Sequence, residues 1–488
     1  MSDRADARRR LCLTQQEPAF ELLVVGCGGG PLENNLSSYL VKPKTRRWSD
    51  PGATLALDAG SSLGAIASLA ADDPALFADF FPQGDDDHRD SSSPFAPITD
   101  AAAAGPAETP RSRDLRAAQN AGVVWDAISA ILLTHGHLDH LAGLVLASAV
   151  QCARPSGPKP VWGLERTVRN LERAMGGGVW PVLGARRAAG EEGACKALAY
   201  EYRHPTPIPI STEVSSSVGG ESELSFTAWP VAHGPNPAAS ASSGADIDAS
   251  EPTTTTMPAS ERDVYHSTAV FVRVGAPPPT AAAAAAIPSP SSSSASPREF
   301  LFFGDVEPDS VSRTGLNRRV WECAAPKIVD RRLEVIFLEC SYPASQPREY
   351  LFGHLSPPYV LEELKVLADL VQAERERRRR RRRGAADPGS GTEADEEAAA
   401  GAGDGPPLRG VKVVITHIKD ELYPSSPPPT ASPSPSKSAV GAAANMSPTS
   451  SPPETVHERI ERELNELERE VRTGVEFVIA EQGMRIVF

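Results

Sequence analysis

The residues best suited to chemistry are gathered in one short segment, THGHLDH at positions 134–140. It follows an apolar run that we expect to be a strand. His135 and His137 are two residues apart, so their side chains point to the same side of an extended segment. Asp139 and His140 fall where the chain turns into an expected helix, and they can face a second point nearby. Imidazole and carboxylate ligands of this kind suit Zn²⁺, and Mn²⁺ or Fe accept them as well.

The surrounding sequence predicts the elements that would position such a site. Apolar runs predict strands at 20–25, 38–41, 54–58, 130–133, 265–274, 300–303, 335–339 and 411–416, and a closing hairpin at 475–479 and 484–487. Helices are expected from about residue 138 and, from the i, i+3, i+4 spacing of apolar residues, at 357–371. Several strands end in a His or Asp. In layered α/β folds, sites collect at strand ends.

The motif also carries a family resemblance. HxHxDH after a strand resembles the hallmark of the metallo-β-lactamase fold. The longer string HGHLDHLAGL at 135–144 resembles the signature of the class II cyclic-nucleotide phosphodiesterases, the fungal-type low-affinity cAMP phosphodiesterases. The resemblance covers the patterned segments and not the low-complexity ones. It implies an α/β fold, an αββα sandwich with low-complexity insertions.

The resemblance further implies that three later strand ends complete a site for two divalent metal ions. A lone His or Asp after a strand is usually structural, so these assignments depend on the resemblance. Asp58 resembles the early aspartate of the fold, which orients metal ligands from behind, although a simple turn residue is the other interpretation. The implied ligands are His135, His137 and His233 for one ion, Asp139, His140 and His417 for the other, and Asp305 as the bridge.

A catalytic histidine is also implied. The segment LFGHLS at 351–356 resembles an element that places a histidine beside the phosphate in related phosphodiesterases and in tRNA 3′-processing nucleases. His354 would then contact the phosphate or donate a proton, and a structural histidine is the alternative. Asp139 is counted with His354 as catalytic. The segment GCGGGPLENN at 26–35 resembles the N-terminal part of the family and predicts a tight turn near the site. YHST at 265–268 resembles another family segment, but we interpret His266 as structural.

The implied function is a dimetal hydrolase that cleaves the 3′-phosphoester bond of 3′,5′-cyclic nucleotides in cyclic-nucleotide signalling. cAMP would give 5′-AMP, and cGMP is the second candidate substrate. The alternative is a tRNA 3′-processing endonuclease of the same fold, which uses the same metal ligands. Such nucleases resemble one another in an early Pro-Thr…Arg segment, where this chain instead has PLENN at 31–35. They also need a basic RNA-binding arm, which we do not find in this acidic sequence.

The composition is consistent with a small-molecule substrate. The formal charge is −14, and it falls to −21 without the seven consecutive arginines at 377–383. An acidic body is a poor general binder of nucleic acid but can concentrate divalent cations. Six scattered cysteines without a CxxC pair indicate neither a disulfide framework nor a thiolate metal site, so we expect a reducing, cytoplasmic location. We find no secretory h-region, and no apolar stretch approaches the roughly 18 residues of a membrane span.

The domain organisation follows from the low-complexity tracts. We expect one domain at 18–488 after an N-terminal tail at 1–17. Ser-, Ala-, Pro- and charge-rich inserts, expected to be disordered, fall at about 84–116, 236–262, 276–298, 376–408 and 424–454. The arginine run at 377–383 is either a nuclear-targeting segment or a solvated continuation of the preceding helix, and we favour the helix.

Overall fold

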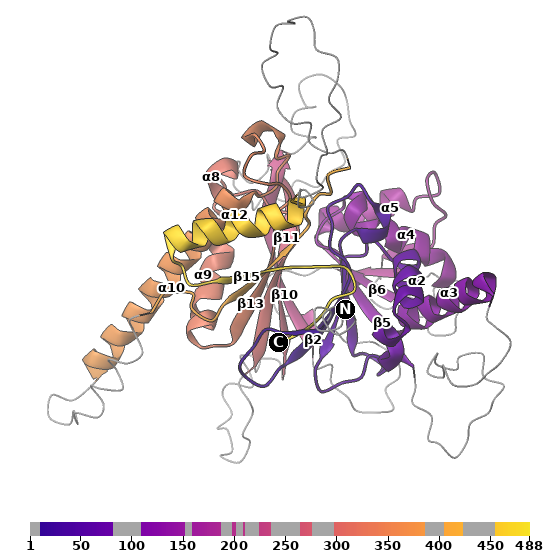
Figure 1. The fold of residues 1–488 in the computed structure, drawn as a ribbon, viewed down its shortest axis with the longest axis horizontal. Coiled ribbons are helices and arrows are strands. Elements are labelled where there is room, and N and C mark those ends of the chain that lie inside the picture. The colour runs from indigo at the N-terminus through magenta and orange to yellow at the C-terminus, as the bar shows by residue number, and fades with distance from the viewer. Residues whose placement is uncertain are drawn as a thin grey trace, which may run out of the picture.

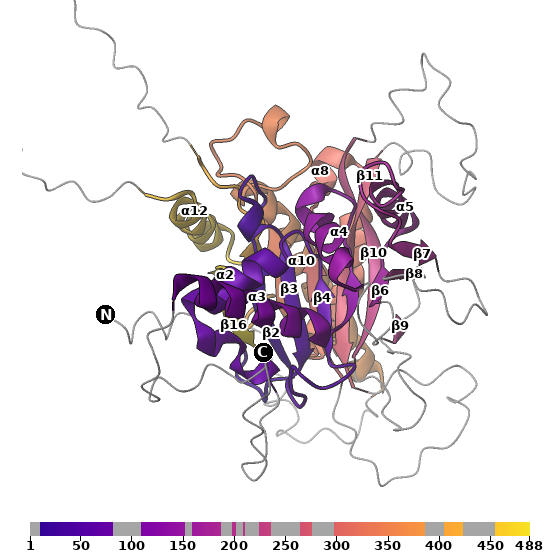
Figure 2. The same ribbon diagram turned by 90° about the vertical axis from the view of Figure 1, so that its right-hand side faces the viewer.

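The computed structural model describes residues 10–81, 109–151, 159–186, 198–201, 208–209, 224–235, 264–275, 297–385, 405–422 and 454–488. These residues form two β-sheets packed face to face, with helices on both outer faces (Figures 1 and 2). This is the αββα sandwich that the family resemblance predicts. None of the described helices has the length and apolar character needed to cross a membrane.

The first sheet has nine described strands and contains the N-terminal part of the chain. In spatial order they are β1 (Arg10–Cys12), β16 (Arg485–Val487), β2 (Phe20–Gly26), β3 (Ser38–Pro43), β4 (Thr54–Leu57), β5 (Ile128–Leu132), β6 (Lys159–Trp162), β8 (Leu198–Glu201) and β7 (Gly184–Arg186). Its outer face is covered by α2 (Leu63–Asp72), α3 (Pro110–Ala127), α4 (Leu138–Gln151) and α5 (Glu165–Ala174).

The second sheet has seven described strands and contains most of the C-terminal part. In spatial order they are β15 (Glu476–Ile479), β14 (Lys412–Thr416), β13 (Leu333–Glu339), β12 (Arg298–Phe303), β11 (Val264–Val274), β10 (Leu224–Pro235) and β9 (Ile208–Pro209). On its outer side lie α8 (Asp309–Ser312), α9 (Leu316–Val329), α10 (Pro357–Ala385) and α12 (Val456–Val471). Short 3₁₀ turns are η1 (Glu33–Asn35), η2 (Pro74–Phe80) and η4 (Arg348–Tyr350).

Three hydrophobic layers hold the sandwich together. Successive side chains of a strand point to opposite faces, and β2 shows the consequence. Its Leu22 and Val24 belong to the layer between the sheets, whereas Leu23 and Val25 belong to the layer under the first set of helices. The third layer joins the second sheet to α9, α10 and α12. Because the central strands are buried on both faces, they read as continuous apolar runs rather than as alternating ones.

The strand directions bring the expected site residues to one edge. β4 and β5 are parallel neighbours in the first sheet, and β12, β13 and β14 are parallel neighbours in the second. β10 runs in the same direction as β12, because each pairs antiparallel with β11. The carboxyl ends of these strands therefore meet at the same edge of the sandwich.

The predicted closing hairpin is wrong. The two C-terminal strands do not pair with each other but belong to different sheets. β15 extends the second sheet by pairing parallel with β14, whereas β16 pairs antiparallel with β2 and parallel with β1 in the first sheet. The short turn between them crosses the sandwich, so each strand finds a partner that is distant in sequence. Local spacing predicted the two strands but not their pairing.

The observed elements also shift the borders of the expected inserts. α3 begins at Pro110 and β12 at Arg298, inside the ranges assigned to inserts. α10 continues through the arginine run to Ala385, which agrees with the helical interpretation of that run (Figure 1). The apolar face of α10 ends at the buried Val371. Further along the helix, Arg378 forms an ion pair with Asp330, the residue directly after α9. The interiors of the five inserts lie outside the described residues.

Candidate metal centre

The candidate residues lie at or just beyond the carboxyl ends of five strands, β5, β10, β12, β13 and β14. His135 and His137 lie between β5 and α4, and Asp139 and His140 form the first turn of α4. The later residues are His233 near the end of strand β10, Asp305 two residues after β12, Glu339 at the end of β13, and His417 directly after β14. His354 stands three residues before α10.

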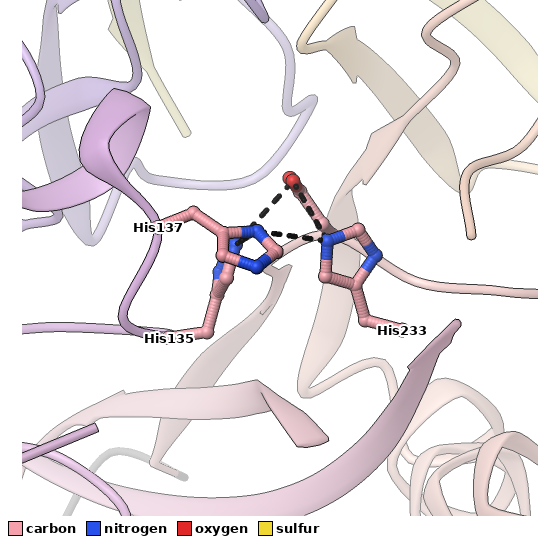
Figure 3. Close-up of side chains that lie close together, drawn as sticks. His135, His137 and His233 are labelled. Atoms are coloured by element: carbon pink, nitrogen blue, oxygen red, sulfur yellow. Dashed lines mark hydrogen bonds and ion pairs between the residues drawn. The ribbon is translucent and has the colours of Figure 1, made fainter. Parts of the chain in front are cut away.

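The structure brings these side chains together into two overlapping groups that share Asp305. Potential ligand atoms of each group all lie within 4.8 Å of one another. Figure 3 shows His135, His137 and His233 converging on one point, with a carboxylate opposite them. Nε2 of His135 lies 3.5 Å from Asp305 Oδ2, and Nε2 of His140 lies 3.2 Å from Asp305 Oδ1. The groups are His135, His137, His233 and Asp305, and Asp139, His140, Asp305 and His417.

Two features of these groups fit divalent cations. Ring nitrogens face each other closely: His140 Nε2 and His417 Nε2 are 3.1 Å apart, and His233 Nε2 lies 3.2 Å from His137 Nδ1. Nitrogen lone pairs at such distances need a proton or a cation between them. In addition, Oδ2 of the buried Asp305 has no hydrogen-bond partner in the described part of the chain. A buried carboxylate oxygen left in this way is costly unless a cation compensates it.

Hydrogen bonds behind the cluster fix how the imidazoles face inward. Asp58 is fully buried, and its Oδ2 accepts from Nδ1 of His140 at 2.7 Å while its Oδ1 accepts from the backbone N–H of Thr134 at 2.8 Å. Nδ1 of His233 donates to the carbonyl of Gly353 at 2.8 Å. With Nδ1 occupied, Nε2 of each ring is presented to the centre. This is the support that metal-binding histidines usually have.

The electrostatics of the site favour neutral imidazoles around a cation. Burial lowers the pKa of His233 to about 3 and holds the pKa of His135 well below its usual value. Burial opposes ionisation of Asp305, but the surrounding histidines outweigh it and hold its pKa well below the usual range. Burial likewise opposes a proton on His140, yet Asp305 and Asp58 raise its pKa, so positive charge is favoured at this point. Metal binding requires neutral imidazoles and ionised carboxylates, which His135, His233 and Asp305 supply, and a cation would take the place of the proton that is favoured on His140.

The glycine-rich segment after β2 lies against the site, as its sequence predicts. Gly28 pairs with Ile418, and a Cβ on Gly29 would lie 2.6 Å from Cε1 of His417. Only glycine permits this approach. His417 itself has a φ of 60°, and Asp58 one of 56°. Left-handed backbone in non-glycine residues costs about 1–3 kcal/mol each and persists where the surrounding structure enforces it, often at functional sites.

Glu339 is a site residue that the sequence analysis missed. His354 Nδ1 donates to Glu339 Oε1 at 2.9 Å, and Ser341 Oγ donates to Oε2 at 2.7 Å. Burial and the charge of Asp305 raise the pKa of Glu339 to about 7. With His354 and His417 it forms a third group of potential ligands. The available signal was a glutamate closing a buried strand next to strands that end in Asp305 and His417.

Tyr265 is a second residue that was missed. Its ring stacks on His137 with centroids 4.7 Å apart and an interplanar angle of 8°. Asn170 of α5 donates to its hydroxyl at 3.0 Å. His137 is the exposed member of the first group, so Tyr265 supports one face of its ring. The adjacent His266 belongs to none of the three groups, in line with its interpretation as structural.

Comparison with known proteins shows the family and the fold of the chain. The family model of the class II cAMP phosphodiesterases matches residues 108–247 and 291–483. A 3′,5′-cyclic-nucleotide phosphodiesterase of Aliivibrio fischeri is 24% identical over 356 residues, covering 73% of this chain and 77% of the relative. One from Schizosaccharomyces pombe is 26% identical over 364 residues, covering 73% and 78%. The crystal structure of unliganded yeast PDE1 has the same fold, with a TM-score of 0.55 and 19% identity over 96% of this chain and 99% of that one.

Proposed function

The chain belongs to the class II cAMP phosphodiesterases and is a 3′,5′-cyclic-nucleotide phosphodiesterase, and from this premise we propose that it hydrolyses cAMP to 5′-AMP at the His/Asp cluster. The scissile bond is the 3′-phosphoester, and cGMP is the second candidate substrate. The observation that carries the assignment of the cluster is the convergence of its two groups on the shared carboxylate of Asp305.

We assign the two groups as ligand sets for two divalent metal ions. Zn²⁺ fits the mixture of imidazole and carboxylate best, and Mn²⁺ or Fe suits the same donors. When bound, such ions act as Lewis acids that lower the pKa of water and neutralise phosphoryl charge. The proposed sets are His135, His137 and His233 for one ion, Asp139, His140 and His417 for the other, and Asp305 as the ligand common to both.

His354 is the proposed proton donor to the leaving 3′-oxygen. Its Nδ1 is held by Glu339 at 2.9 Å, so Nε2 is the nitrogen left for the substrate. It lies beside the cluster, with Nδ1 3.8 Å from Asp305 Oδ2, and it is buried. Asp139 is the more exposed carboxylate of the cluster, and its Oδ2 lies 3.3 Å from Nε2 of His417. It can therefore accept a hydrogen bond from an attacking water while it remains ionised.

A single comparison of substrates tests the proposed function. Purified protein is incubated with cAMP, cGMP and a precursor tRNA, with and without a chelator. We expect 5′-AMP from cAMP, loss of turnover with the chelator, and an intact tRNA. Cleavage of the tRNA with cyclic nucleotides untouched would favour the tRNA-processing alternative, and turnover of cAMP in metal-free protein would exclude the proposed metal sites.

Two further expectations belong to this proposal. The partner is a small-molecule substrate rather than nucleic acid, in keeping with the net charge of −14. The location is cytoplasmic, with the arginine run at 377–383 as the segment able to direct the chain to the nucleus. The four cysteines in the described part of the chain are free. Imaging of a fluorescent fusion, with and without the seven arginines, tests the location.

A further inference from the structure

Large apolar side chains are exposed on the chain segments that carry His137, Asp139 and His354. Leu138, between His137 and Asp139 in sequence, is 71% exposed. Phe352, two residues before His354, is 67% exposed, and Tyr350 is 53% exposed. Single exposed apolar residues need no explanation, but a group of them on the segments that carry a site marks a surface that a ligand covers.

The backbone at Phe352 is fixed against the strand that carries His233. Phe352 has a φ of 52°, a conformation that bulky side chains rarely adopt. The next residue, Gly353, has a φ of 83° and accepts the hydrogen bond from His233 Nδ1 through its carbonyl. A Cβ on Gly353 would lie 2.7 Å from the backbone nitrogen of Gly234, so only glycine fits there. The turn is thus tightly packed on its backbone side while it holds the ring of Phe352 in solvent.

A second aromatic ring accompanies Phe352. The ring centroids of Tyr350 and Phe352 are 6.3 Å apart, with an angle of 54° between the planes. Leu351, between these two aromatic residues in sequence, is buried and anchors the segment. The rings of Tyr350 and Phe352 remain exposed. Hydrophobic burial would normally draw both rings inward. A strained backbone that keeps an aromatic ring exposed beside a hydrolytic centre is consistent with selection for ligand contact.

The chemistry of the substrate identifies the occupant. A cyclic nucleotide has an anionic phosphodiester at one end and a planar, weakly polar base at the other, with the ribose between them. The anionic phosphodiester suits the His/Asp cluster, so the base extends away from the cluster, toward the exposed surface beside it. Aromatic side chains bind bases by stacking, because every base has a π-face.

We propose that Phe352, with Tyr350 beside it, forms the platform on which the nucleobase of the cyclic nucleotide stacks. This inference rests on the proposed function, because it assumes that the phosphodiester binds at the His/Asp cluster. It goes beyond that function by assigning the recognition of the base to residues that take no part in metal binding or proton transfer.

The test compares substrates with and without a base. cAMP and methyl ribofuranoside 3′,5′-cyclic phosphate contain the same scissile ring, and only cAMP has a base to stack. Phe352→Ala should lower kcat/KM for cAMP by about 5- to 100-fold, mainly through KM, as expected for the loss of one stacked base. The base-free substrate should change by less than about twofold. Phe352→Trp should preserve turnover of cAMP.

Further variants separate the ring from the backbone. Phe352→Gly removes the ring and relieves the strain, so it should reproduce the loss seen with Phe352→Ala. Leu115→Ala, at an exposed apolar residue of α3, should leave both substrates unaffected. Equal losses for both substrates, or no loss for cAMP, would overturn the platform. A wild-type protein that hydrolyses neither cyclic phosphate would instead contradict the proposed function itself.

Discussion

His354 and Glu339 form a buried hydrogen-bonded pair, with Nδ1 of the histidine 2.9 Å from Oε1 of the glutamate. The backbone N–H of Val306, next to Asp305 in the chain, donates to the same oxygen at 2.9 Å. The pair therefore links the turn that carries Asp305 to the segment before α10. This arrangement explains how a histidine outside the two proposed ligand sets is held beside them.

We expect His354 to affect catalysis more than metal binding. A positioned acid typically contributes about 10²–10⁴-fold, so His354→Ala should lower kcat for cAMP by roughly that factor. The metal content should remain near that of the wild type, because each proposed ion keeps its own ligands. Steady-state kinetics and elemental analysis of the same preparation measure the two effects.

A substrate with a better leaving group distinguishes the roles of His354. A nitrophenyl phosphodiester needs little help from an acid, so His354→Ala should hydrolyse it nearly as well as the wild type. Equal damage to both substrates would indicate phosphate binding instead of proton donation. Loss of metal would show that the ligand assignment is wrong.

Glu339 should act through His354. Glu339→Gln keeps the size of the side chain but cannot accept from His354, Val306 and Ser341 in the same way, so we expect a loss of activity of about 10- to 100-fold. In a double variant with His354→Ala, the loss should not exceed that of His354→Ala alone, because both changes remove one function. Additive losses would assign Glu339 a separate role. Glu363→Gln is the matched control, since Glu363 is a buried glutamate that accepts from Trp321 away from the site.

The ligand sets predict which variants lose which ion. His233→Ala should abolish one metal site and His417→Ala the other, so each variant should retain about half of the wild-type metal after dialysis. Asp305→Ala should weaken both sites, because its two oxygens face both groups. Elemental analysis per chain gives the answer. If His233→Ala and His417→Ala each lost all metal, the two sites would be interdependent and the division into two sets would fail.

Much of the site could be predicted because its key motif is local. The residues at 135–140 are close in sequence, so their spacing alone predicts that His135 and His137 point to the same side and that Asp139 and His140 can face a second point nearby. The family resemblance then supplied His233, Asp305 and His417, which only the fold brings near. Glu339 gave no comparable signal, and the family resemblance of the segment at 265–268 did not single out Tyr265, since a buried acid or aromatic ring in a strand usually has a structural role. Their importance becomes visible only through contacts with His354 and His137.

The sequence predicted many of the strands but not their pairing, and it did not predict β1 or β6 to β9. Buried runs such as 20–25 and 411–416 differ from the observed β2 and β14 by a residue at most. The assignment of β15 and β16 to different sheets depends on contacts with β14 and β2, which are remote in sequence. Among the described helices only α4 and α10 were predicted, and α12 was missed although it has a clear start. Thr455 and Glu458 form a capping box there, and α12 buries Val456, Ile460 and Leu464 at four-residue spacing.

A buried charge cluster at the other end of β2 predicts a pH-dependent stability. Glu21 is buried, and its carboxylate lies 3.1 Å from Lys42 Nζ, 3.0 Å from Lys44 Nζ and 3.2 Å from Arg485 Nη1. Burial alone would raise its pKa, but the charge of Lys42, followed by hydrogen bonds from Lys44 and Lys42, outweighs burial and lowers the pKa from 4.5 to about 2. The folded protein thus favours the ionised form more than the unfolded chain does.

The sign of the effect follows from this depressed pKa. The stabilisation is fully present above about pH 4.5, where Glu21 is ionised in both states, and it is lost as the pH falls toward 2. After allowance for solvent screening, Glu21→Gln should lower the free energy of unfolding at pH 7 by about 1–3 kcal/mol. The difference in the free energy of unfolding between the wild type and Glu21→Gln should become smaller below pH 4.5, because the wild type then loses the same interaction.

Urea unfolding of both proteins between pH 7 and pH 3 measures this difference. The exposed Glu349→Gln is the control, and its free energy of unfolding should stay within about 0.5 kcal/mol of the wild type. If the difference in the free energy of unfolding between the wild type and Glu21→Gln stayed constant from pH 7 to pH 3, Glu21 would stabilise the fold by packing rather than by charge.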